Sequence, residues 1–251
     1  MENELWGIAG LGGPAWPDSP LGLAVLLAGL ALVVGALWKS GISQSLRGLN
    51  RSQWALFIAL CGASLLLSQL FPLVIPWSNP LLRSHPATSA VMLLSAAPYL
   101  LAGVALNVPA AIIVGLFAGV GRVVGQTGAP LDVVGVALAA GASAALMRQI
   151  YAGRGFELLR QPVVSGVLGR VIVVATTSII IFADSSSAAG LFGALDLALY
   201  LGLWSALPLL IEGAVGGAIT SAVLWIAPHW RPDRGTVPSP LQRSLQRQLV
   251  A

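Results

Sequence analysis

The chain has 251 residues, of which 57% are hydrophobic and only 9% charged, and its formal net charge is +4. A soluble domain carries about 25% charged residues, so this composition could not cover a water-facing surface with polar groups. It therefore excludes an ordinary soluble domain and predicts an integral membrane protein, because a lipid bilayer accepts an apolar outer surface. The basic residues lie mostly in short connections and in the tail, which argues against a nucleic-acid partner.

The first third of the chain contains two apolar runs, at residues 21–38 and 54–77. A helix needs about 20 apolar residues to cross a bilayer, so each run predicts one crossing. The connection at residues 40–53 is polar and basic. The N-terminus begins Met-Glu-Asn-Glu and lacks the basic start of a cleavable signal peptide, so the first run is expected to stay as a membrane anchor.

Three further runs follow the polar segment 78–87, and they predict three more helices. A tight turn is expected at Asn107-Val108-Pro109, because the residue before a proline is disfavoured in the helical region. The runs cover residues 88–106, 110–124 and 131–147.

The last apolar part of the chain follows a second basic connection at residues 148–161. It begins with a run at 162–183. Residues 188–225 are then almost continuously apolar, which is too long for one ordinary crossing. Pro208 is the expected break, because proline lacks the N–H that a helix interior needs.

The basic connections predict the orientation. Residues 39–53 and 148–161 should both be cytoplasmic, and the four runs between them are the even number this requires. The tail from Pro228 carries four arginines and should be cytoplasmic too. Three crossings after residue 161 would put it outside. A re-entrant or interfacial segment at 188–207 would give seven crossings and a cytoplasmic tail; eight crossings with an external tail is the alternative.

Charged side chains inside membrane spans cost about 2.5–3.5 kcal/mol each on insertion scales, so they are functional candidates. Three interpretations are open: a buried ion-pair lock, a polar lining for a ligand pocket, or side chains that reach to the interface. The candidates are Arg122, Arg170, Asp196 and Glu212.

Glycines are spaced four residues apart in two of the later runs, which predicts Gly-rich helix packing because backbones can then approach closely. The pairs are Gly115 with Gly119, Gly121 with Gly125, and Gly213 with Gly217.

Cofactor chemistry has little support. Cys61 is alone in an apolar run and reads as a small buried hydrophobe. His85 and His229 lie beside prolines in polar segments rather than within a span, where axial ligation of a haem would need them. Lys39 ends the first run, so it cannot serve a retinal Schiff base in the late helices. With no metal-ligand spacing and no enzyme motif, we expect no metal, no cofactor and no catalytic residue.

Two segments carry a family resemblance: Leu-Asn-Val-Pro-Ala-Ala-Ile-Ile-Val-Gly-Leu-Phe-Ala-Gly-Val-Gly-Arg at 106–122, and Ala-Leu-Pro-Leu-Leu-Ile-Glu-Gly-Ala-Val-Gly-Gly at 206–217. Both resemble the Gly-rich helices of the substrate-capturing S components of energy-coupling-factor vitamin transporters. They also resemble the membrane input domains of lytic-regulator-type sensor kinases. The tail at 231–249 looks like the juncture after the membrane part of Chloroflexi-type sensor histidine kinases.

The resemblance implies a sensory input module of the bacterial inner membrane that responds to a small ligand, a lipid or the membrane state and signals through a partner protein. The chain departs from that family by having no kinase, cyclase or phosphoacceptor domain. An S component is the second expectation, although two extra N-terminal spans count against it, and a structural subunit of a larger membrane complex is the third. The expected fold is an all-α bundle of seven or eight membrane segments. Its expected parts are a polar N-terminal segment (1–19), two helices with their loops (20–87), the sensor-like bundle (88–227) and a basic tail (228–251).

Overall fold

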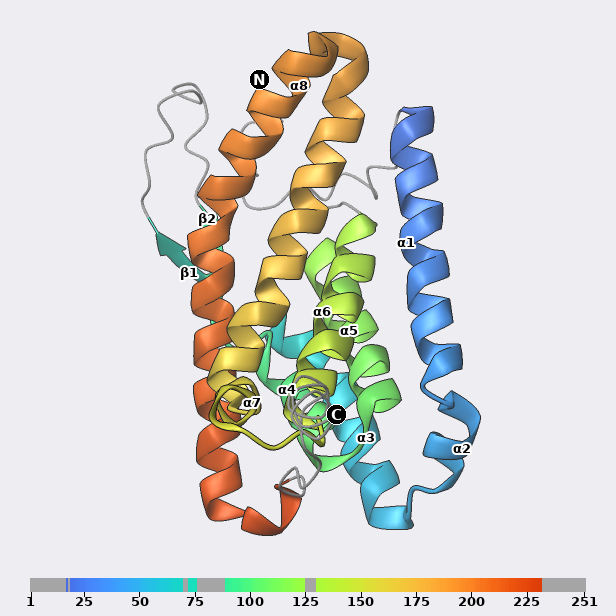
Figure 1. The fold of residues 1–251 in the computed structure, drawn as a ribbon, viewed down its shortest axis with the longest axis vertical. Coiled ribbons are helices and arrows are strands. Elements are labelled where there is room, and N and C mark those ends of the chain that lie inside the picture. The colour runs from blue at the N-terminus through green and yellow to red at the C-terminus, as the bar shows by residue number, and fades with distance from the viewer. Residues whose placement is uncertain (1–16, 18, 70–71, 76–88, 125–129, 232–251) are drawn as a thin grey trace, which may run out of the picture.

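In the computed structural model of the chain, the described residues are 17, 19–69, 72–75, 89–124 and 130–231. They form an elongated helical bundle with one small antiparallel sheet (Figure 1). The elements are α1 (Pro20–Lys39), α2 (Ile42–Arg47), α3 (Arg51–Leu67), β1 (Pro72–Ile75), β2 (Ser89–Met92), α4 (Ala97–Ala105), α5 (Val108–Arg122), α6 (Leu131–Met147), α7 (Arg154–Leu159), α8 (Pro162–Ile226) and the 3-10 turn η2 (Pro228–Trp230).

Within the described ranges, three helical segments are long and apolar enough to cross a membrane. They are α1, with 20 residues, and two parts of α8, Pro162–Ala183 with 22 residues and Gly190–Ile226 with 37. Helices α3, α5 and α6 are apolar but shorter, at 17, 15 and 17 residues. The molecule is therefore built of apolar helices that suit a lipid environment, as the composition predicts.

Helix α8 is a hairpin, and its turn lies a few residues after the predicted end of the run at 162–183. The backbone leaves the helical region at Gly190, with φ 70° and ψ 169°, and the chain then runs back alongside itself (Figure 1). The predicted break at Pro208 is wrong, because Pro208 lies inside the second arm. A positive φ costs glycine little, whereas a proline inside an apolar helix is tolerated when its surroundings satisfy the freed carbonyl. Residues 188–207 form the turn of the hairpin and the start of its second arm.

The region between α3 and α4 also differs from the expected pair of helices. Helix α3 ends at Leu67 instead of continuing to residue 77. The apolar residues beyond it form strand β1, which pairs with β2 in antiparallel register from Pro72 opposite Met92 to Ile75 opposite Ser89. The β-branched residues in these stretches favour a strand, and Pro72 stands at the first position of β1, where a strand tolerates proline. Helix α4 then begins only at Ala97.

Local capping explains where other helices begin. The Asn107 side chain accepts the N–H of Ala110 at 2.8 Å, and Pro109 stands in the first turn of α5, where its missing N–H costs nothing. Asn50 and Gln53 form a reciprocal capping box at the start of α3. The turn that the sequence predicts at Asn107 is thus the boundary between α4 and α5.

The basic connections lie at one end of the bundle. Helices α2 and α7 and the end of the second arm of α8 are at the bottom of Figure 1, opposite the turn at Gly190. These three places contain the basic connections 39–53 and 148–161 and the start of the tail at Pro228. The hairpin returns the chain to the end from which α8 started.

Candidate functional site

The two arms of α8 approach closely at a pair of glycines. A Cβ added to Gly166 would lie 2.5 Å from the carbonyl oxygen of Gly213, and one added to Gly213 would lie 2.6 Å from that of Gly166. No side chain fits there. Arg170 is one helical turn after Gly166 and Glu212 directly precedes Gly213, so this contact brings the guanidinium and the carboxylate together across the hairpin.

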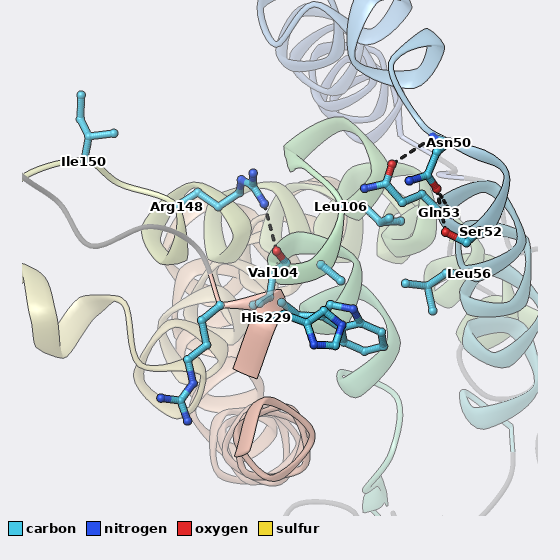
Figure 2. A pocket seen from close by; sticks show the side chains of 12 residues that line it. Asn50, Ser52, Gln53, Leu56, Val104, Leu106, Arg148, Ile150 and His229 are labelled. Atoms are coloured by element: carbon cyan, nitrogen blue, oxygen red, sulfur yellow. Dashed lines mark hydrogen bonds between the residues drawn. The ribbon is translucent and has the colours of Figure 1, made fainter. Parts of the chain in front are cut away.

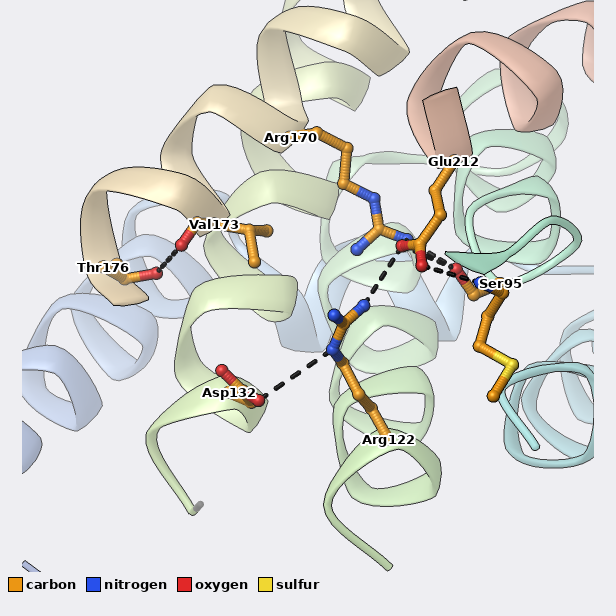
Figure 3. Close-up of polar contacts among 8 residues, drawn as sticks. Ser95, Arg122, Asp132, Arg170, Val173, Thr176 and Glu212 are labelled. Atoms are coloured by element: carbon orange, nitrogen blue, oxygen red, sulfur yellow. Dashed lines mark hydrogen bonds and ion pairs between the residues drawn. The ribbon is translucent and has the colours of Figure 1, made fainter. Parts of the chain in front are cut away.

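Glu212 is the centre of a buried polar network (Figure 3). Its Oε2 is 3.0 Å from Nη2 of Arg170 and 3.1 Å from Nη1 of Arg122. Its Oε1 accepts the backbone N–H of Met92 at 2.8 Å, and Ser95 Oγ donates to Oε2 at 3.4 Å. From the second arm of α8, this carboxylate therefore reaches four other places in the chain: the end of β2, the turn before α4, the end of α5 and the first arm of α8.

Arg122 extends the network to a second carboxylate. Its Nε is 3.9 Å from Oδ2 of Asp132, which lies in the first turn of α6 and is 6% exposed. The two cations and two anions balance one another, which lowers the cost of keeping all four away from water. At 3.9 Å the Asp132 contact is an ion pair without a hydrogen bond, so Glu212 is the stronger partner of Arg122.

The network is deeply buried but not fully satisfied. Arg170 is 1% exposed and Glu212 is 0% exposed. Nη2 of Arg170 also donates to Ser95 Oγ at 2.6 Å. Among the described residues, however, its Nε and Nη1 have no hydrogen-bond partner, and neither has the hydroxyl of Tyr99. The guanidinium lies 5.7 Å from the centre of the Tyr99 ring, where the π face partly compensates it. A buried cation with unpartnered donors is held there by the surrounding fold at a cost in free energy.

The space beside these charges is small. A hollow lined by Ser68, Ser95, Arg122 and Arg170 has no room for a water-sized molecule. Ligand pockets usually enclose about 300–1,000 Å³. In this arrangement the charges therefore act on one another, as an ion-pair lock does.

The fourth sequence candidate lies elsewhere. Asp196 is exposed on the second arm of α8, six residues after Gly190 and near the hairpin turn, and no ion pair joins it to another described residue. The structure thus brings Arg122, Arg170 and Glu212 together and leaves Asp196 apart. A carboxylate close to the end of an apolar helix can reach polar surroundings without a buried partner.

Sequence reasoning missed several members of the network. Asp132 could have been found, because it is a carboxylate one residue inside an apolar run. Ser95 and the backbone of Met92 gave no such signal, since their roles depend on a sheet and a turn within a run predicted to be helical. Tyr99 is fully buried beside Arg170, but a tyrosine in an apolar helix is common and marks nothing by itself.

A larger cleft of 730 Å³ lies at the basic end, between the start of α3 and the turn η2 (Figure 2). Its charged groups do not converge on one point. Arg148 donates to the carbonyl oxygens of Gly103 and Val104, at 3.3 and 3.0 Å, and Arg231 donates to that of Leu224. His229 lines this cleft and is exposed, whereas His85 and Gly125 lie outside the described residues.

Among the residues that the structure describes, no group of His, Cys, Asp or Glu side chains could hold a metal ion. Comparisons with protein-family models, with curated proteins and with solved structures found no match to this chain.

Proposed function

We propose that the chain is a multi-pass protein of the bacterial cytoplasmic membrane, with seven passes and its basic end in the cytoplasm. The passes are α1, α3, the segment 88–106, α5, α6 and the two arms of α8. The shared position of the basic connections supports this orientation, because basic residues favour the cytoplasmic side. Non-helical backbone at membrane depth is tolerated where protein buries and satisfies it, as Glu212 does for the N–H of Met92.

Within that membrane, the chain is a sensory input module without catalytic activity of its own. The observation that carries this proposal is the position of Glu212, which joins the segment after β2 to α5 and to both arms of α8. The second arm continues from Glu212 to Ile226 at the basic end, where a partner protein would read its position. Losing one partner of a buried ion pair is costly, so such a network favours discrete packing arrangements that a stimulus can bias.

A substrate-capturing role, like that of an S component, is the second candidate. The specific observation in its favour is the set of unpartnered buried donors on Arg170 and Tyr99, which an anionic group could satisfy. The absence of space beside them ranks it second, because a substrate would have to open the network first. Mass spectrometry of small molecules retained by the purified protein tests it directly.

The sensing proposal is tested by distances between spin labels at Ile58 on α3 and Ile226 at the end of α8, which are 65% and 77% exposed. The background carries Cys61→Ala, and the protein is placed in nanodiscs of short-chain or long-chain phosphatidylcholine. We expect the distance distribution to depend on bilayer thickness, and Glu212→Gln to shift it in both lipids.

Asp196→Asn is the matched control, since it neutralises a carboxylate on the same arm outside the network. Arg122→Lys is a milder second variant that keeps the charge but loses the planar fork. A folded Glu212→Gln protein with an unchanged distance distribution in both lipids would contradict the proposal.

A further inference from the structure

Helix α1 contacts the bundle closely along only part of its length. A Cβ added to Gly29 would lie 2.7 Å from Cγ1 of Val134 on α6, and Leu26 and Val33 are buried on this face. Figure 1 shows α1 along one side of the molecule, beside α5 and α6. Nearer its basic end, a groove of 480 Å³ separates α1 from α5, α6 and the first arm of α8.

The groove exists because α6 presents small side chains to it. Ala137, Ala142 and Ala145 line the groove beside Leu138. Gly141 instead lets α5 approach, since a Cβ there would lie 2.8 Å from Cγ1 of Ile112. Except for two residues at one end, every lining residue is apolar or glycine. Its volume lies within the usual range for ligand sites, unlike the space beside Arg170, and its chemistry suits a hydrocarbon chain.

The two polar lining residues, Lys39 and Ser40, stand together at the basic end of the groove. Lys39 is exposed, and none of the carboxylates in the described ranges pairs with it. Trp38 beside it is 85% exposed, and exposed tryptophan and lysine at a helix end are typical of the headgroup layer. A free cation at the mouth of an apolar groove matches a negatively charged headgroup attached to an acyl chain.

We propose that this groove binds one acyl chain of an anionic phospholipid from the leaflet at the basic end, with the headgroup phosphate at Lys39. The lipid fills the gap that α6 leaves and completes the attachment of α1. The inference rests on the proposed membrane location but not on the sensing role.

The full chain is reconstituted in nanodiscs with equal parts of phosphatidylglycerol and phosphatidylcholine, then moved into mild detergent, and retained lipids are counted by native mass spectrometry. We expect one phospholipid to be retained per chain, mostly phosphatidylglycerol. Lys39→Gln should lower the preference for phosphatidylglycerol roughly fivefold, as expected for one basic residue near a membrane surface. Arg154→Gln removes a cation in α7 at the same end, outside the groove, and should leave the preference unchanged.

Ala142→Leu should remove the retained lipid of either kind, because the new side chain enters the groove. Ala31→Leu makes the same change at an exposed position of α1 and should retain it. Ala145→Leu fills the same wall if the Ala142 variant does not fold.

Retention of no phospholipid, equal retention of both lipids by the wild type, or retention of added oleate in their place overturns the lipid site. If a partner protein or an apolar segment of the chain occupied the groove, native mass spectrometry would detect the protein without a bound lipid. That result would also contradict the lipid site. Recovery of the chain in the soluble fraction would instead overturn the proposed membrane location.

Discussion

Two carboxylates on the second arm of α8, Glu212 and Asp196, lie in opposite surroundings. Inside the second arm, Glu212 is 0% exposed and bonded to two arginines. About four turns earlier on the same arm, Asp196 is exposed and forms no ion pair with the described residues. The same residue class in the same apolar helix is thus an organising centre in one place and a surface group in the other.

The difference comes from what surrounds each half of the hairpin. We call the part around Glu212 the inner half, and the part around Asp196 and the turn at Gly190 the outer half. The inner half packs against β2, α4 and α6, and glycines let its arms touch. The outer half extends beyond α5 and α6 (Figure 1), and its large apolar side chains face outward, with Phe192 at 83% exposed and Leu203 at 73%. A charge in an apolar helix is therefore a sign of function only where other elements enclose it.

Removing the buried carboxylate should have the largest effect. Glu212→Ala leaves Arg170 buried without an anionic partner, which should cost about 3–5 kcal/mol of unfolding free energy. Asp196→Ala, the same change in the outer half, should stay within about 0.5 kcal/mol. Reversible unfolding in bicelles measures both, and equal losses would erase the distinction between the two halves.

The glycine contact should come next. Gly213→Ala puts a methyl group against the backbone of Gly166 and forces the arms apart, with an expected loss of about 1–3 kcal/mol. Gly35→Ala in α1 meets no atom within 4 Å and should instead stabilise by up to about 1 kcal/mol. The same unfolding assay measures both, and a tolerated Gly213 variant would mean that the arms do not touch there.

The turn of the hairpin should be sensitive to backbone conformation alone. Gly190 has φ 70° with ψ 169° and open space around it, so Gly190→Ala should cost about 1–3 kcal/mol because this backbone region is essentially restricted to glycine. Pro208→Ala should leave the hairpin in place, because the helix is already continuous there. Cross-linking between cysteines placed on the two arms measures whether the hairpin is intact. Loss of the cross-link in the Pro208 variant alone would indicate that the chain breaks at Pro208, as the sequence predicted.

The weakest contact of the network should give the smallest effect. Asp132→Asn removes an ion pair of 3.9 Å while Arg122 keeps Glu212, so the loss should be no more than about 1 kcal/mol. Thermal unfolding in detergent checks it. A loss as large as that of Glu212→Ala would move the centre of the network to Asp132.

Much of this site was accessible from the amino-acid sequence, because Arg122, Arg170 and Glu212 are charges in apolar runs and such charges need partners. The positions of these charges in the sequence do not predict which of the candidate side chains contact one another. Their meeting depends on a second arm that runs back along the first without the additional break predicted at Pro208.

The helical character can be predicted from composition. The shared end of the basic connections can be predicted from the positive-inside bias. The sheet does not, because residues 72–75 and 89–92 are apolar enough for a helix and their pairing is a long-range choice. With that sheet missed, Ser95 and the N–H of Met92 could not be assigned to the site.

The most direct test of the central claim is a double-mutant cycle between Arg170 and Glu212, using Arg170→Met, Glu212→Gln and the combined variant. Arg122 keeps Asp132 when Glu212 is neutralised, so the cycle isolates the contact across the hairpin. If the pair joins the two arms, the combined variant is less destabilised than the sum of the single ones, by about 1–3 kcal/mol. Additive losses within about 0.3 kcal/mol would show that the two side chains do not interact and would contradict the ion-pair lock.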